Sequence, residues 1–168
     1  MDFTNPLVYG VPCFLALILV ELTYSKTHGR EDLYKWKDLA SSVSMGLGSA
    51  ILAPLLKTVS AIVLFTFVYN VFNPEIDGVH TNIMGYESFG YAWYVWLLCM
   101  LADDFSYYWF HRQNHKVRFF WAAHVVHHSS DNFNLGTAVR NGWFTIFYKP
   151  LFYMWMPAIG FPPEMVIV

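Results

Sequence analysis

Long apolar runs constrain the fold of this chain more than any other feature of its sequence. Apolar residues make up 56% of the 168 residues and charged residues only 13%, about half the charged share that is usual in a soluble domain. The runs cover residues 7–24, 40–72 and 89–110, and a fourth begins at residue 143. Since a membrane-spanning helix needs about 20 mostly apolar residues, we predict an all-α integral membrane protein with about four transmembrane or membrane-embedded helices.

The basic residues predict how these segments are oriented. They gather after the first run, at Lys26, Arg30, Lys35 and Lys37, and again around the histidines, whereas residues 73–90 contain neither lysine nor arginine. By the positive-inside rule, both basic regions lie on the cytoplasmic side. This requires residues 40–72, which are interrupted by Pro54 and Lys57, to cross the membrane once. A single kinked crossing fits the charges better than a hairpin of two short helices.

Five of the seven histidines fall within eighteen residues, directly after the third apolar run. They form two clusters, His111-x3-His115 and His124-x2-His127-His128. Residues three or four apart share one face of a helix, so each cluster predicts imidazoles on one side of a helix. Imidazole is a common metal ligand. The two clusters therefore predict a metal site at the membrane surface. A single histidine would not be enough to predict one.

Three polar residues near the histidines are further candidates for the site. Asp104 precedes His111 by about two helical turns and is expected to accept the second N–H of a ligand imidazole; the alternative is a solvated helix-end acid, or one paired with Arg112. Asn134 and Arg140 follow the second cluster at spacings compatible with one helical face. Arg140 is predicted either to meet an anionic headgroup or a carboxylate, or to act only as a cytoplasmic topology charge.

The ligand type alone does not identify the metal, because imidazole binds zinc, copper, iron and nickel. A structural zinc site would be expected to recruit cysteine thiolates, but Cys13 and Cys99 each lie inside an apolar run, away from the histidines. A histidine-only site beneath apolar helices instead suits oxygen chemistry on a lipid. The lipid chain stays in the bilayer while its reactive carbon meets iron at the interface.

The histidine region resembles the fatty acid hydroxylase (sterol desaturase) superfamily. The resemblance rests on LADDFSYYWFHR at 101–112, His115, WAAHVVHHSS at 121–130 and NFNLGTAVR at 132–140. Among its members, the segment is most similar to bacterial sterol-desaturase-like proteins and to alkylglycerol monooxygenases. The resemblance implies two non-haem irons, O2 as co-substrate, and hydroxylation, desaturation or ether cleavage of a lipid. The metal ligands that it implies are His111, His115, His124, His127 and His128.

The superfamily's third histidine cluster has no counterpart in this sequence. We therefore expect residues 1–168 to be a single membrane domain, with its histidine region at about 101–142, that is incomplete at its C-terminus. By resemblance, its partners are a membrane lipid (a sterol, fatty acyl or ether lipid) and a separate electron donor. No nucleic-acid partner is expected, and the oligomeric state is not predicted. Similarity to bacterial members favours the bacterial inner membrane over the endoplasmic reticulum.

Two other functions stay open at this point. The missing third cluster would also fit an inactive scaffold or a lipid-binding fragment. A histidine-ligated haem protein is less compatible with the sequence. Bis-histidine haem uses single histidines on opposing helices, whereas this chain has clusters at both positions.

Overall fold

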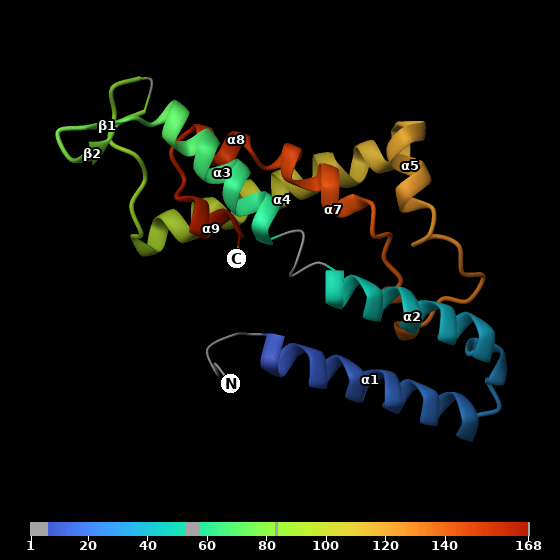
Figure 1. The fold of residues 1–168 in the computed structure, drawn as a ribbon. Coiled ribbons are helices and arrows are strands. Elements are labelled where there is room, and N and C mark those ends of the chain that lie inside the picture. The colour runs from blue at the N-terminus through green and yellow to red at the C-terminus, as the bar shows by residue number, and fades with distance from the viewer. Residues whose placement is uncertain (1–6, 53–57, 83, 168) are drawn as a thin grey trace. The chain divides into compact units, whose positions relative to one another are not determined.

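The protein is helical over most of the residues that its structure describes. The computed structural model describes residues 7–52, 58–82 and 84–167 (Figure 1). The helices are α1 Leu7–Thr27, η1 Glu31–Leu33, α2 Trp36–Leu52, α3 Thr58–Phe72, α4 Trp93–Lys116, α5 Arg118–His124, α6 Leu135–Ala138, α7 Thr145–Tyr148, η3 Lys149–Phe152, α8 Trp155–Ala158 and α9 Pro163–Ile167. The strands are β1 Glu75–Ile76 and β2 Val79–His80. Apart from these two short strands, the prediction of a helical chain is confirmed.

The chain divides into two compact units. Unit 1 comprises Met1–Ser49 and Val125–Gly142, and unit 2 comprises Ala50–His124 and Trp143–Val168. The boundary between His124 and Val125 falls inside the second histidine cluster. The predicted ligands are therefore distributed over both units.

Unit 1 is held together by polar contacts between segments that are distant in sequence. Helix α1 ends where Gly29 adopts a φ of 65°, a left-handed conformation that glycine tolerates at a helix C-terminus. The carboxylate of Glu21 on α1 accepts hydrogen bonds from the Tyr34 hydroxyl and from the backbone N–H of Leu135. Burial, followed by the hydrogen bond to Glu21, raises the pKa of Tyr34 to about 12. The phenol is therefore harder to deprotonate than an ordinary tyrosine and remains the donor.

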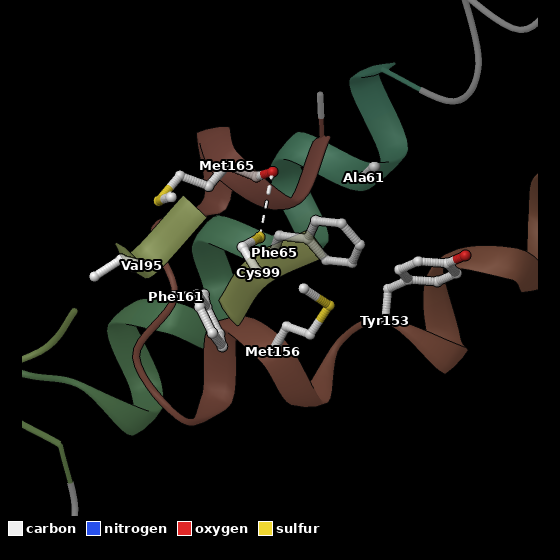
Figure 2. Close-up of a cluster of buried hydrophobic side chains, with 8 residues drawn as sticks. All are labelled: Ala61, Phe65, Val95, Cys99, Tyr153, Met156, Phe161 and Met165. Atoms are coloured by element: carbon white, nitrogen blue, oxygen red, sulfur yellow. Dashed lines mark hydrogen bonds between the residues drawn. The ribbon is translucent and has the colours of Figure 1, made fainter. Parts of the chain in front are cut away.

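Unit 2 is built around an apolar core. Figure 2 shows its buried side chains, which come from α3, α4, the α8–α9 segment and the residue that follows η3: Ala61, Phe65, Val95, Cys99, Tyr153, Met156, Phe161 and Met165. Helix α3 packs against α8 and α9, and α4 packs against α9 (Figure 1). Burying a Phe or Met side chain contributes about 1.5–3 kcal/mol, so this cluster stabilises unit 2.

A β-hairpin lies between α3 and α4, within residues 73–90, where no strands were predicted. Strands β1 and β2 pair antiparallel across Asp77 and Gly78, whose φ angles are 52° and 81°. Two positive φ angles are characteristic of the tight hairpin turn that Asp-Gly favours. The hairpin is tied to the end of α3 by His80, whose Nδ1 lies 2.8 Å from the Asn73 carbonyl oxygen.

The predicted apolar segments correspond to helices with different bounds. The first run forms α1, and the third forms α4, which continues through the first histidine cluster to Lys116. Residues 40–72 lie in two helices, α2 and α3, while Pro54 and Lys57 lie outside the described residues. The proline-rich fourth run forms several short helices. Within the described ranges, no helix is both long enough and apolar enough to cross a membrane.

Candidate metal centre

The last two turns of α4 place His111 and His115 side by side. Because they are four residues apart on a continuous helix, they share one face. Their Nε2 atoms lie 3.1 Å apart, and their ring centroids are separated by 4.8 Å. Helical continuity beyond the apolar run, on which the predicted pairing depended, is confirmed.

A break at Val117 brings His124 to the same place. Val117 has extended backbone angles and ends α4, and α5 begins at the next residue. After this bend α5 packs against α4 (Figure 1). The His124 ring stands nearly perpendicular to those of His111 and His115, at centroid distances of 4.8 and 4.9 Å. His124 is only 6% exposed, so the helical corner encloses the third imidazole.

The three histidines, referred to below as the histidine trio, are suited to hold a metal ion. Each offers one ring nitrogen, and these atoms all lie within 4.8 Å of one another. In an octahedral site with bonds of about 2.1 Å, neighbouring nitrogens are about 3 Å apart and opposite nitrogens about 4.2 Å apart. The 3.1 Å between His111 and His115 therefore matches neighbouring ligands, and the whole set is slightly wider than one coordination sphere. Iron is among the metals that imidazole binds.

Two aromatic rings flank the trio. The Tyr107 ring stacks on His111 at a centroid distance of 5.7 Å, and Trp121 lies 5.5 Å from His115. Asp104 occupies the predicted position on α4, seven residues before His111, with an exposed side chain. Its role as a carboxylate partner for a ligand histidine stays a prediction.

The other two predicted ligands lie in unit 1. His127 and His128 are neighbours with ring centroids 5.1 Å apart. The Nδ1 atom of His127 lies 2.8 Å from the carbonyl oxygen of Arg140. The trio lies in unit 2, so its geometry does not test the predicted role of His127 and His128 as metal ligands.

Asn134 and Arg140 both make well-defined structural contacts in unit 1. The Asn134 side chain caps α6 by accepting the N–H of Thr137 at 3.0 Å, and its amide donates to the Leu33 carbonyl. Arg140 is 5% exposed and forms an ion pair with Asp38. A carboxylate, that of Asp38, therefore contacts Arg140. A catalytic role for Asn134 and Arg140 stays a prediction.

Two buried residues beside the trio, Asn114 and Tyr148, were not predicted from the sequence to belong to the site. Asn114 lies between the two histidines of α4, is fully buried, and accepts a hydrogen bond from the Tyr148 hydroxyl at 2.9 Å. Its Nδ2 atom is a buried side-chain nitrogen without a partner among the described residues. The available signal was helical spacing, because Asn114 falls four residues after the buried Phe110 and so lies on the inward face of α4.

Comparisons with known proteins show which family and which proteins this chain is similar to. The sequence model of the fatty acid hydroxylase family matches residues 96–168. The chain is 34% identical to alkylglycerol monooxygenase of Danio rerio over 159 residues, covering 89% of this chain and 32% of the relative. It is 32% identical to the Homo sapiens protein of the same name over 167 residues, covering 95% of this chain and 33% of the relative. The chain thus spans about a third of the length of these relatives, and no solved structure matches it significantly.

Proposed function

Because the chain belongs to the fatty acid hydroxylase superfamily, we propose that it forms part of a non-haem iron enzyme that uses O2 to oxidise a membrane lipid. The observation that carries this proposal is the convergence of three imidazoles at the corner between α4 and α5. Bound iron would supply the redox chemistry, which protein side chains alone do not provide. The chain would supply the ligands and their orientation, with the Tyr107 and Trp121 rings beside them.

Each of the named residues has a proposed part in this site. His111, His115 and His124 hold one iron, and the superfamily resemblance adds His127 and His128 as further ligands of a di-iron centre. The Tyr107 ring restricts rotation of the His111 imidazole by stacking on it. Asp104, on the same helix, orients a ligand through hydrogen bonding.

We propose an ether lipid of the alkylglycerol class as the substrate, ahead of sterols and fatty acyl lipids. The support is that the similarity to proteins named alkylglycerol monooxygenase extends over 89% and 95% of this chain. Large apolar side chains exposed on three helices favour contact with a bilayer; examples are Leu19 on α1, Phe67 on α3 and Leu101 on α4. The proposal includes a membrane location with the histidines on the cytoplasmic side, and a separate electron donor.

Iron content tests the metal site directly. The protein is purified in detergent, and iron per chain is measured by mass spectrometry for the wild type, His124→Ala and His28→Ala. His28 is a matched control because it lies at the end of α1, where its ring stacks on Tyr24. We expect iron in the wild type and in His28→Ala, and its loss in His124→Ala with the helical circular dichroism retained. A wild-type protein without iron would overturn the proposal, and lipid binding without iron would favour the scaffold.

The substrate class is tested through a spectroscopic probe at the metal. Cobalt replaces iron, and the visible spectrum is recorded with an alkylglycerol, with an acylglycerol of equal chain length, and with a sterol. We expect the alkylglycerol to perturb the cobalt bands most strongly. A response to the sterol alone would contradict the substrate assignment while leaving the metal site intact.

A further inference from the structure

The buried guanidinium of Arg140 is fixed by partners on all three of its nitrogens. Nε donates to the Ser42 hydroxyl at 3.2 Å, and Nη1 donates to the Ser129 hydroxyl at 2.9 Å. Nη2 donates to the carbonyl oxygen of Asp38 at 2.9 Å and forms the ion pair with its carboxylate. The planar arrangement of arginine donors makes such a multiple contact directional. Arg140 is thereby held to helix α2 on one side and to the segment after His128 on the other.

The carboxylate of Asp38 is fixed in turn. While one of its oxygens pairs with Arg140, the other accepts a hydrogen bond from the Ser130 hydroxyl at 2.6 Å. The same hydroxyl oxygen accepts the backbone N–H of Asn132 at 3.1 Å. Both charged groups are therefore bound by the 129–132 segment as well as by each other. The backbone on both sides of the ion pair has little freedom to move.

The main chain of Arg140 carries this constraint to a predicted metal ligand. Its carbonyl oxygen lies 2.8 Å from Nδ1 of His127. A carbonyl only accepts hydrogen bonds, so Nδ1 carries the proton and the neutral ring has its lone pair on Nε2. A hydrogen bond at one ring nitrogen commonly sets which of the two binds a metal. The Arg140 carbonyl thus favours the tautomer with hydrogen on Nδ1 and constrains the rotation of the His127 ring.

We propose that the ion pair between Asp38 and Arg140 is a positioning device that holds His127 with Nε2 as its metal-binding nitrogen. The inference rests on the proposed function, since it assigns a role toward the metal. Arg140 acts through its backbone carbonyl and Asp38 acts through Arg140. Neither side chain touches the metal.

The tautomer of His127 tests the proposal in metal-free protein. Histidine is labelled with ¹⁵N, spectra are recorded at a pH where the imidazole is neutral, and the His127 signal is identified by its loss in His127→Ala. We expect an Nδ1–H ring in the wild type and a mixture of tautomers in Arg140→Met and Asp38→Asn. Finding an Nε2–H ring in the wild type would overturn the proposal even if the variants failed to fold.

Metal affinity, measured by cobalt titration, provides the second readout. We expect Arg140→Met and Asp38→Asn to weaken binding by about 10-fold, the lower end of the loss seen when a partner of a ligand histidine is removed, because the Arg140 carbonyl remains in both variants. Binding by Arg140→Lys should be stronger than binding by Arg140→Met. Arg30→Met is the matched control, because Arg30 forms a surface ion pair with Asp32 in the same unit. It should change neither the tautomer nor the affinity.

The two proposals fail in different ways. Folded Arg140→Met protein with unchanged tautomer and affinity would refute the positioning role, while wild-type iron binding by the trio would stand. A wild type in which His127 has the Nδ1–H ring but which binds no metal would refute the proposed function. It would also refute the role of the ion pair in positioning a metal ligand.

Discussion

In unit 2 the histidine trio rests on apolar and aromatic packing, whereas in unit 1 His127 is held by hydrogen bonds that lead to a buried ion pair. Around the trio, His111 contacts Tyr107 and His115 contacts Trp121. Beneath α4 lies the apolar core that includes Cys99 and Met156. In unit 1 the corresponding support is the network of Asp38, Arg140 and the serines around them.

The two kinds of support respond to different changes. Apolar packing is sensitive to volume, because a deleted group leaves a cavity. A buried polar network is sensitive to pairing, because removing one partner leaves the other without compensation in a medium of low dielectric constant. The trio should therefore tolerate changes of charge nearby but not changes of shape, and His127 should show the reverse sensitivity.

The largest expected effect comes from emptying the core of unit 2. Met156 is 0% exposed, so Met156→Ala should lower the free energy of unfolding by about 2–5 kcal/mol. Met100, on the exposed side of α4, provides the control Met100→Ala. Hydrogen exchange followed by mass spectrometry should show faster exchange in α4 and α8 and unchanged exchange over residues 36–49. Equal acceleration in both regions would contradict the separation of the two units.

A close backbone approach in unit 1 gives the next largest effect. A Cβ atom at Gly46 would lie 2.9 Å from the carbonyl oxygen of Val139, whereas one at Gly10 would meet nothing within 4 Å. Gly46→Ala should therefore cost about 1–3 kcal/mol through overpacking. Gly10→Ala should add about 0.5–1 kcal/mol, because alanine stabilises a helix relative to glycine. Denaturant unfolding measures both changes in the free energy of unfolding. If Gly46→Ala raised this free energy as Gly10→Ala does, the contact with Val139 would be unimportant.

The buried polar pair beside the trio is an exception within the apolar unit. Tyr148→Phe removes the donor to Asn114, whose Nδ2 is already unpartnered among the described residues. Unfolding should become easier by about 1–2 kcal/mol. The double variant Asn114→Leu/Tyr148→Phe should recover much of this loss, because both polar groups are then gone. The exposed Tyr94 supplies the control Tyr94→Phe, and a double variant less stable than the single one would mean that Asn114 has another role.

The smallest expected effect is a pH dependence in unit 1. The pKa of Asp38 lies below its ordinary value of 3.8, chiefly through the Ser130 hydrogen bond; burial opposes this shift, and the hydrogen bond and charge of Arg140 add to it. A lowered carboxyl pKa adds stability that is present above about pH 3.8 and is lost as the pH falls through the folded-state value.

Ser130→Ala should therefore lower the free energy of unfolding by about 0.5–1.5 kcal/mol at neutral pH, and the difference from the wild type should shrink in acid. Urea unfolding across this pH range measures it. Ser44→Ala is the control, since the Ser44 hydroxyl donates only along its own helix, to the Ala40 carbonyl. A difference that grows as the pH falls would reverse the assigned sign.

Local patterns in the sequence were enough to predict that His111 and His115 lie side by side on one helix. Apolar length indicated α1 and α4, and the four-residue spacing of His111 and His115 was sufficient to place them together. The Val117 break has no comparably strong local signal, so convergence with His124 was expected only from the shared residue type. The Asp77-Gly78 turn was recognisable in principle, but no hairpin was predicted there.

The ion pair could not be predicted in the same way. Asp38 and Arg140 are 102 positions apart, and no periodic pattern connects them. The charge of Arg140 was visible in the sequence, but its burial and its partner depend on how α2 and the 125–142 segment pack together. Tertiary packing determines such contacts, and no local sequence pattern in either segment indicates them.

The bend at Val117 also affects the order in which the molecule assembles. It closes the trio within one short stretch, since His111 and His124 are 13 positions apart, against the 102 positions between Asp38 and Arg140. Loop-closure entropy rises by about 0.6 kcal/mol per doubling of length, so the longer loop costs about 2 kcal/mol more to close. The corner between α4 and α5 is thus a low-contact-order element, in which the three imidazoles can come together before the distant halves of unit 1 have met.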